Sequence, residues 1–152
     1  MAGSLSRLWN RGTRFRVISK SFIMQETKLQ DAYACYQALR TISFHNESYR
    51  NRTFGQLVYN KFGMTPVGTS TAAQSSQSTT HDHFNNCQQV GKYLAEHQLT
   101  LEEFQEVIQE SKKTIRVTKQ ENQLLRKYQK DKPYGQGLEA YSEAGIGYTL
   151  LS

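Results

Sequence analysis

The sequence is poor in cysteine, proline and long apolar runs, and each shortage excludes a class of protein. The 2 cysteines, Cys35 and Cys87, lie far apart, which excludes a disulfide framework and a cysteine-based zinc site. Only 2 prolines and a mean hydropathy of −0.70 favour a polar helical protein over a β-sandwich, which needs many turns. Because no stretch of about 18 consecutive apolar residues occurs, we expect no membrane span.

Acidic residues are missing from the N-terminal segment, so the net charge of +6 is unevenly distributed. The first carboxylate is Glu26, and five of the 19 basic residues precede it. Removing these five leaves 14 basic residues against 13 acidic ones, which is poor support for a nucleic-acid-binding module because phosphate contacts need a basic surface. The five basic residues are Arg7, Arg11, Arg14, Arg16 and Lys20.

The acid-free segment also has apolar residues at three- and four-residue steps, which favours a basic amphipathic helix. Arginine-rich, acid-free helices of this kind are typical of mitochondrial targeting segments. We therefore predict that residues 1–25 direct mitochondrial import, with a nucleic-acid arm or a structural basic helix as the alternatives. The apolar residues are Leu5, Leu8, Trp9, Phe15, Ile18 and Phe22.

Two amphipathic helices joined by a short turn are predicted next. Residues 28–45 contain no glycine or proline, and residues 49–62 repeat the helical spacing before Gly63, which suits a helix end. The short turn makes the two helices antiparallel neighbours. The predicted core residues are Leu29, Ala32, Tyr36, Leu39 and Ile42 in the first helix and Phe54, Leu57, Val58 and Phe62 in the second.

The remaining chain is predicted to consist of a linker, a long helical region and a tail. Residues 64–80 consist mainly of Ser and Thr, with Gln, Ala and Gly, and lack periodicity, which indicates a flexible linker within a helical domain over residues 26–133. A capping box at Thr100 and Glu103 begins a long charged helix that Pro133 ends.

The long helix has polar residues on its apolar stripe, so the alternative is a helix broken near Thr118. The tail, residues 134–152, has four glycines together with aromatic and aliphatic residues. This composition is too glycine-rich for a helix and too apolar for free solvent exposure. We therefore predict an extended tail that docks on a partner through Tyr141, Ile146 and Tyr148.

Patterns that would indicate catalysis are weak. His81 and His83 have a spacing that can bind a metal, but Asp82 is the only further ligand nearby, so a metal site is a minor alternative. No phosphate-binding or dinucleotide-binding loop occurs, and Cys35 reads as a small buried thiol in a helix. We predict a protein that is not an enzyme and needs no cofactor.

A group of basic residues near the first turn favours an acidic protein partner, because opposite charges steer the encounter and fix its register. The alternative is that these charges only solvate the surface of the hairpin. The residues in question are Arg40, Arg50, Arg52 and Lys61.

The hairpin and the tail resemble the Leu-Tyr-Arg (LYR) family of small mitochondrial proteins, and most of all its branch of assembly factors for mitochondrial complex V, the ATP synthase. The matching elements are the segment Tyr36-Gln-Ala-Leu-Arg-Thr-Ile42, the pair Tyr49-Arg50, the pairs Leu57-Val58 and Lys61-Phe62, and Glu143-Ala-Gly-Ile-Gly147 in the tail.

The resemblance implies an all-α three-helix bundle in the mitochondrial matrix that assists assembly of the catalytic sector of ATP synthase. Implied partners are the chaperone of its α subunit or the nascent catalytic sector, and the acyl carrier protein. Implied partner-binding residues are Arg40 and Arg50 as basic contacts, with Tyr36 and Phe62 along the apolar seam. The alternative is an accessory subunit of a respiratory complex, ATP synthase or mitoribosome.

Overall fold

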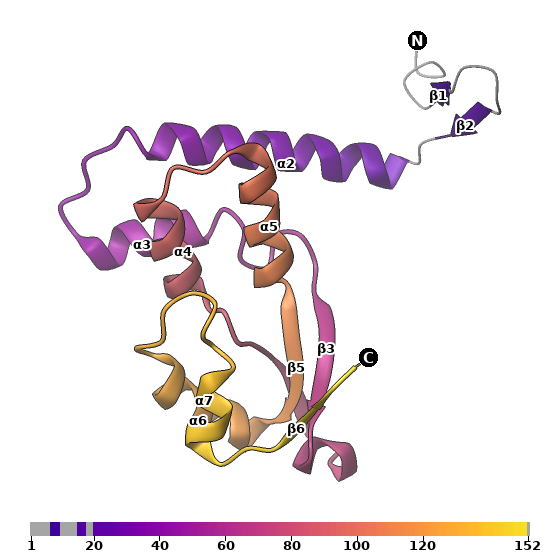
Figure 1. Ribbon diagram of the computed structural model, residues 1–152, viewed down its shortest axis with the longest axis vertical. Helices are drawn as coiled ribbons and strands as arrows, with labels where there is room; N and C mark the ends of the chain where they lie inside the picture. The colour runs from indigo at the N-terminus through magenta and orange to yellow at the C-terminus, as the bar shows by residue number, and fades with distance from the viewer. Residues whose placement is uncertain (1–6, 10–14, 18–19, 152) are drawn as a thin grey trace.

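The protein has a mixed α/β fold, which corrects the predicted all-α three-helix bundle. The computed structural model describes residues 7–9, 15–17 and 20–151, with the side chains of residues 25–151. A layer of helices lies at one end of a four-stranded sheet with the strand order β4-β5-β3-β6 (Figure 1). The bundle prediction is wrong because it assigned strand residues to a linker, to a long helix and to an extended tail.

The elements are short apart from the first long helix. The helices are α2 (Lys20–Leu39), α3 (Glu47–Gly55), α4 (Cys87–Glu96), α5 (Leu101–Ser111), α6 (Lys119–Gln129) and α7 (Glu139–Ala144), with the 3₁₀ turn η1 (Ala72–Ser75). The strands are β1 (Arg7–Trp9), β2 (Phe15–Val17), β3 (Thr65–Ser70), β4 (Thr79–His83), β5 (Lys113–Thr118) and β6 (Tyr148–Leu150).

Side-chain caps fix where the central helices begin. The predicted capping box at the start of α5 is confirmed, because Thr100 accepts from the backbone N–H of Glu103 and Glu103 accepts from that of Thr100. Thr118 and Glu121 form the same reciprocal pair at the start of α6. Such boxes satisfy backbone N–H groups that the first helical turn leaves free.

The predicted long helix is divided by β5, so a helix between residues 113 and 118 is wrong, whereas the alternative of a break near Thr118 is confirmed because Thr118 caps the start of α6. This segment contains Thr114, Ile115, Val117 and Thr118, and all four are buried. Side chains branched at Cβ favour the pleated backbone of a strand over a helix. Thr118, one of the polar residues on the expected helical stripe, therefore lies at the boundary between β5 and α6.

The predicted flexible linker is also wrong, since residues 64–80 contain β3, η1 and the start of β4. β3 lies between β5, to which it is parallel, and β6, to which it is antiparallel. Ser70 at its end is buried, donates a hydrogen bond from its hydroxyl to Glu121 at 2.6 Å and accepts one from the N–H of Ala73 at 3.0 Å. The hydroxyl-bearing residues that suggested a linker thus make ordered contacts.

The C-terminal segment is folded on the sheet and is not an extended tail. It forms α7 and the edge strand β6, and Gly145 ends α7 in the left-handed region at φ 72°. A residue with a side chain rarely adopts that backbone conformation. Gly145, one of the four glycines that argued against a helix, therefore marks where α7 stops.

The N-terminal prediction of an amphipathic helix is contradicted where the structure describes that segment. β1 and β2 pair as an antiparallel hairpin, with Trp9 opposite Phe15, and α2 follows from Lys20. Leu5 and Ile18 lie outside the described residues. The pairing of β1 with β2 does not test whether residues 1–25 direct mitochondrial import, so that role stays a prediction.

Two separate hydrophobic cores hold the fold together. The helical core consists of Leu29, Tyr36, Phe54, Val58, Phe62, Val90, Leu94, Leu99, Phe104, Val107 and Ile108. The sheet core consists of Phe84, Ile115, Val117, Leu125, Ala140, Tyr141 and Ile146.

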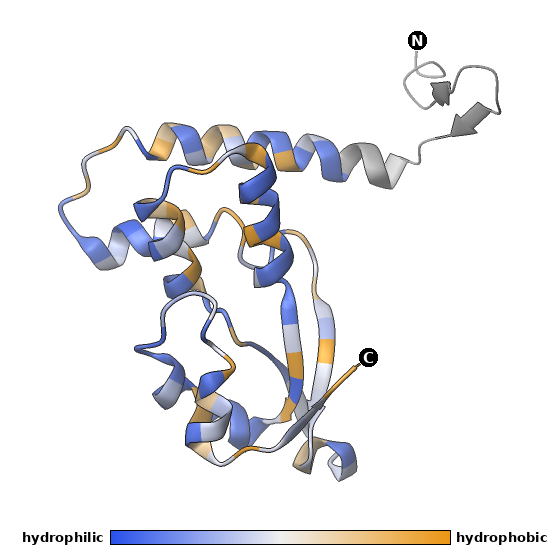
Figure 2. Cartoon of the chain, in the orientation of Figure 1, coloured by the Kyte–Doolittle hydropathy of each residue, from blue (hydrophilic) through white to orange (hydrophobic). Residues whose placement is uncertain are grey.

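Hydrophobic and hydrophilic residues are interleaved on both helices and strands (Figure 2). None of the helices in the described part of the chain has both the length and the apolar composition of a membrane span.

Candidate functional site

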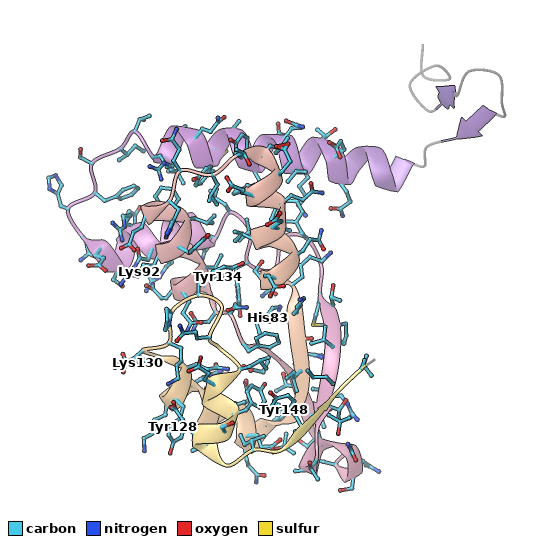
Figure 3. All side chains as sticks on the ribbon, viewed as in Figure 1. His83, Lys92, Tyr128, Lys130, Tyr134 and Tyr148 are labelled. Carbon is cyan, nitrogen blue, oxygen red and sulfur yellow. The ribbon has the colours of Figure 1, made fainter. Side chains whose placement is uncertain are left out.

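An open cleft of about 610 Å³ runs beside the edge strand β4, and we call it the His83 cleft. Its floor is the end of β4, and its two walls come from α6 and from the residues that precede and begin α4. Figure 3 shows His83 nearer the middle of the molecule and Lys130 toward the outside, beyond the end of α6. The lining residues are Tyr59, Asn60, His81, Asp82, His83, Asn86, Cys87, Gln88, Asn122, Arg126, Gln129 and Lys130.

One wall of the cleft carries a regular polar stripe. Asn122, Arg126 and Lys130 are four residues apart, so they follow one face of α6 and its continuation. Successive members are about 6 Å apart along the helix axis, at about 1.5 Å per residue. The reciprocal cap at Thr118 fixes where α6 begins, and buried Leu125 anchors it in the sheet core. The cap at Thr118 and the packing of Leu125 therefore fix the position of the stripe.

The cleft is rich in hydrogen-bond donors, and two of them, Arg126 and Lys130, are cations without a direct ion pair in the described part of the chain. None of the ion pairs among residues 25–151 involves Arg126 or Lys130. Both side chains are exposed. The amides of Asn86 and Asn122 and the ring of His81 add further donors to the same surface. Exposed cations without a carboxylate partner are available to an anionic group of a ligand.

Asp82 is the only carboxylate that lines the cleft, and its hydrogen bonds are directed into the protein. One of its oxygens accepts from the Tyr141 hydroxyl at 2.5 Å and from the Gln129 amide at 2.8 Å. Its exposed fraction is only 5%. Burial raises the pKa of Asp82, while these two hydrogen bonds and the more distant charge of Arg126 act in the opposite direction. Asp82 therefore belongs to the sheet core more than to the cleft surface.

His83 supports the floor of the cleft and does not act as a cation. Burial, with a smaller contribution from nearby His81, lowers the pKa of His83 below its ordinary value, so its ring is neutral at pH 7. Its ring packs against that of Tyr59 with the centroids 5.0 Å apart. Its Nε2 atom is buried and has no hydrogen-bond partner among the described residues.

The reactive side chains of the cleft are not activated for catalysis. Burial raises the pKa of the Cys87 thiol, which keeps it protonated, whereas a nucleophilic cysteine needs a lowered pKa. Burial also raises the pKa of Tyr59. Among the residues that the structure describes, no three His, Cys, Asp or Glu side chains are placed to hold a metal ion. The arrangement is suited to binding an anionic group.

Four of the predicted partner-binding residues are core residues. Tyr36 and Phe62 lie in the helical core, and Tyr141 and Ile146 lie in the sheet core. The exposed fraction is 0% for Tyr141 and 1% for Tyr36. Phe62 and Ile146 are 9% and 8% exposed, so all four side chains are used mainly for packing within the protein.

The other three predicted partner-binding residues are more accessible but are not grouped. Arg40 is exposed, with its guanidinium 6.0 Å from the centre of the Tyr36 ring. Arg50 is half-buried and donates to Asn51 and to Glu96. Tyr148 is half-buried, with its ring 5.1 Å from that of Tyr141. The predicted basic cluster and the predicted tail surface do not form one site.

Sequence reasoning found three residues of the cleft but missed the site. It named His81, His83 and Asp82 as a weak metal-binding group. Outside the cleft, Cys35 was expected to be buried but is exposed on α2. The spacing of Asn122, Arg126 and Lys130 is visible in the sequence as a stripe. The sequence does not show that this stripe faces β4 across a cleft, because the two segments are far apart in the chain.

No protein-family model, curated protein or solved structure matches this chain. None of these comparisons identifies it as an LYR family member, so that resemblance stays a prediction.

Proposed function

We propose that this protein is a non-enzymatic binding protein whose His83 cleft receives an extended acidic segment of a partner protein. The observation that carries the proposal is the pair Arg126 and Lys130, two exposed cations without an ion pair among residues 25–151. The one carboxylate in the cleft, Asp82, is buried and directed toward Tyr141 and Gln129. The cleft surface is therefore complementary to negative charge.

The spacing of the two cations supports an extended segment. Arg126 and Lys130 are separated by about 6 Å along the helix axis. Alternate side chains of an extended strand lie about 6.6 to 6.8 Å apart on one face. Two acidic residues separated by one other residue can therefore meet both cations together.

The floor of the cleft supports the same conformation. β4 is an edge strand that pairs only with β5, and its residues His81, Asp82 and His83 line the cleft. Backbone groups along such an edge can pair with an added strand, a common way to bind an extended peptide. The backbone of β4 then supplies affinity and the stripe on α6 supplies the preference for acidic residues.

Binding of a labelled acidic peptide tests this proposal. The probe is a fluorescein-labelled nonapeptide with glutamate at two alternate central positions, and the readout is fluorescence anisotropy. The double variant Arg126→Gln, Lys130→Gln should weaken binding at least about tenfold, or about 1.4 kcal/mol. Binding by the native chain should also weaken as salt is added, because the contact is near solvent.

Lys127→Gln is the matched control, because Lys127 is an exposed cation on the same helix outside the cleft lining. It should leave the affinity nearly unchanged. If Lys127→Gln weakened binding as much as the double variant, the attraction would be general to the surface and the cleft would not be the site. If the native chain failed to bind the acidic peptide, the proposal would be wrong.

The mitochondrial location and the role in ATP synthase assembly stay predictions from the sequence. The LYR resemblance implied a three-helix bundle, and the mixed fold removes that structural support. The predicted location depends on residues 1–25, and import of the full chain into isolated mitochondria would test it. An acidic protein partner is compatible with an assembly role and does not require one.

A further inference from the structure

A second groove continues from the His83 cleft, and we call it the Tyr134 groove. It has a volume of about 430 Å³ and lies between α4 and the loop that follows α6. Gln88 and Lys130 line both the groove and the cleft, so the two are adjoining parts of one surface. A ligand held beside Lys130 therefore has a direct path into the groove.

The Tyr134 groove differs from the cleft because it presents a row of aromatic rings. The ring of Tyr93 lies 4.5 Å from that of Tyr134 at an interplanar angle of 33°. The ring of His97 stacks on Tyr93 at 4.1 Å and 24°. Tyr93 and Tyr134 are half-buried and His97 is exposed. Such a row offers ring faces and edges against which another aromatic side chain packs favourably.

Buried amides hold the loop of the groove against the rest of the protein. Gln89, with 5% of its surface exposed, donates to the backbone carbonyls of Gln129 and Lys132. Asn85, with 2% exposed, accepts from the N–H of Gly135 at 2.9 Å. The loop between these residues carries Tyr134. The groove is therefore preorganised, which lowers the entropy lost when a ligand binds.

The charges of the groove do not favour a continuation of the acidic segment. Glu47, Glu96 and Asp131 line this groove together with Lys92, Lys130 and Lys132, whereas Asp82 is the only carboxylate lining the cleft. Because both signs are present in equal number, a further acidic residue of the ligand gains no net attraction there. The aromatic rings are therefore the feature of the groove that favours one kind of side chain.

We infer that the partner segment carries an aromatic residue just beyond its acidic pair, and that this residue packs against Tyr93 and Tyr134. The inference rests on the proposed function, because it places the acidic pair beside Arg126 and Lys130. It defines the partner motif as two acidic residues at alternate positions followed or preceded, within a few residues, by an aromatic one.

Three labelled peptides test the inference on the native full chain. The first carries two alternate glutamates and a tryptophan two residues away, the second has serine in place of the tryptophan, and the third keeps the tryptophan and has serines in place of the glutamates. Each is made with the tryptophan on either side, because the strand direction is open. The tryptophan should raise affinity about fivefold over the second peptide.

Two variants locate the gain. Tyr134→Ser should remove most of the fivefold advantage of the tryptophan peptide while the peptide without tryptophan binds as before. Tyr49→Ser is the control, because Tyr49 is an exposed tyrosine outside both grooves, with 62% of its surface exposed. A melting curve for each variant establishes that it is folded. The comparison of peptides on the native chain needs no variant.

The outcomes separate the inference from the proposed function. Equal binding of the peptides with and without tryptophan overturns the inference and leaves the acidic site intact. Failure of every peptide to bind overturns both. A nucleoside triphosphate that binds more tightly than the tryptophan peptide and displaces it would assign the aromatic row to a nucleotide base, which also overturns the inference.

Discussion

The helical core and the sheet core each bury a tyrosine whose hydroxyl forms hydrogen bonds, but the partners of the two hydroxyls differ in kind. Tyr36 in the helical core donates to the carbonyl of His97 and accepts from the N–H of Leu99 at 2.8 Å. Tyr141 in the sheet core donates to the carboxylate of Asp82 at 2.5 Å. The helical core thus depends on neutral backbone groups, whereas the sheet core depends on an ionisable side chain.

The largest expected effects come from one glycine in each region. A Cβ on Gly91 would lie 1.6 Å from the carbonyl oxygen of Asn51, and one on Gly137 would lie 1.6 Å from that of Phe84. Backbone must move in both cases, so Gly91→Ala and Gly137→Ala should each lower the free energy of unfolding by about 3 kcal/mol or more. Urea denaturation measures both.

Gly147→Ala serves as the control for these two variants. Its added Cβ would meet only the exposed Thr71 hydroxyl at 3.2 Å, so the expected loss is below about 1 kcal/mol. A Gly137→Ala protein as stable as the native chain would show that the loop before α7 is not seated on Phe84. In that case only the helical region would be tightly packed.

Removing each tyrosine hydroxyl sharpens the comparison between the cores. Tyr141→Phe deprives a buried carboxylate of a donor and should cost about 2 to 3 kcal/mol, because hydrogen bonds to charged groups are the stronger ones. Tyr36→Phe frees two backbone groups and should cost about 1 to 2 kcal/mol. The measurement is again urea denaturation at pH 7. A larger loss for Tyr36→Phe would reverse the assignment of the ionisable core to the sheet.

The smallest expected effect is a pH dependence confined to the sheet core. Burial raises the folded-state pKa of Asp82, so the folded chain binds a proton there more tightly than the unfolded chain does. The Asp82 contribution to stability is therefore complete below its unfolded pKa of about 4 and is lost as the pH rises through the folded pKa. The stability of the native chain minus that of Asp82→Asn should increase as the pH falls from about 7 to about 4.

The subtraction isolates Asp82, because His83 titrates in both proteins. Urea denaturation at several pH values supplies the two curves. A difference that shrinks toward low pH would mean that the hydrogen bonds from Tyr141 and Gln129 outweigh burial in setting the pKa.

The helical region could be predicted from the sequence because its signals are local. The helical period placed Leu29, Tyr36, Phe54, Val58 and Phe62 in a core, and all five are buried there. The period also placed Ile42 inward, but its exposed fraction is 52% because α2 ends at Leu39. Helix periodicity thus identifies a face and does not fix where the helix stops.

The sheet region could not be predicted because its pairing is not local. Thr65 lies beside Lys113, and Thr69 lies beside both Arg116 and Thr149. No short window of sequence contains both members of such a pair, and strands of three to six residues leave little periodicity. The His83 cleft depends on this pairing, since its floor is β4 and its wall is α6. The site was therefore as inaccessible to sequence reasoning as the sheet.

The position of β3 in the chain has a consequence for how the protein folds during synthesis. Both neighbours of β3 follow it, and Lys113 is made 48 residues after its partner Thr65. At about 5 to 20 residues per second the ribosome needs roughly 2 to 10 s to supply β5. During that time β3 has no partner strand, and an apolar unpaired strand would invite aggregation. We expect the hydroxyl-rich composition of residues 64–80, with Pro66 in the strand, to make this segment less prone to aggregate over that interval than an apolar strand.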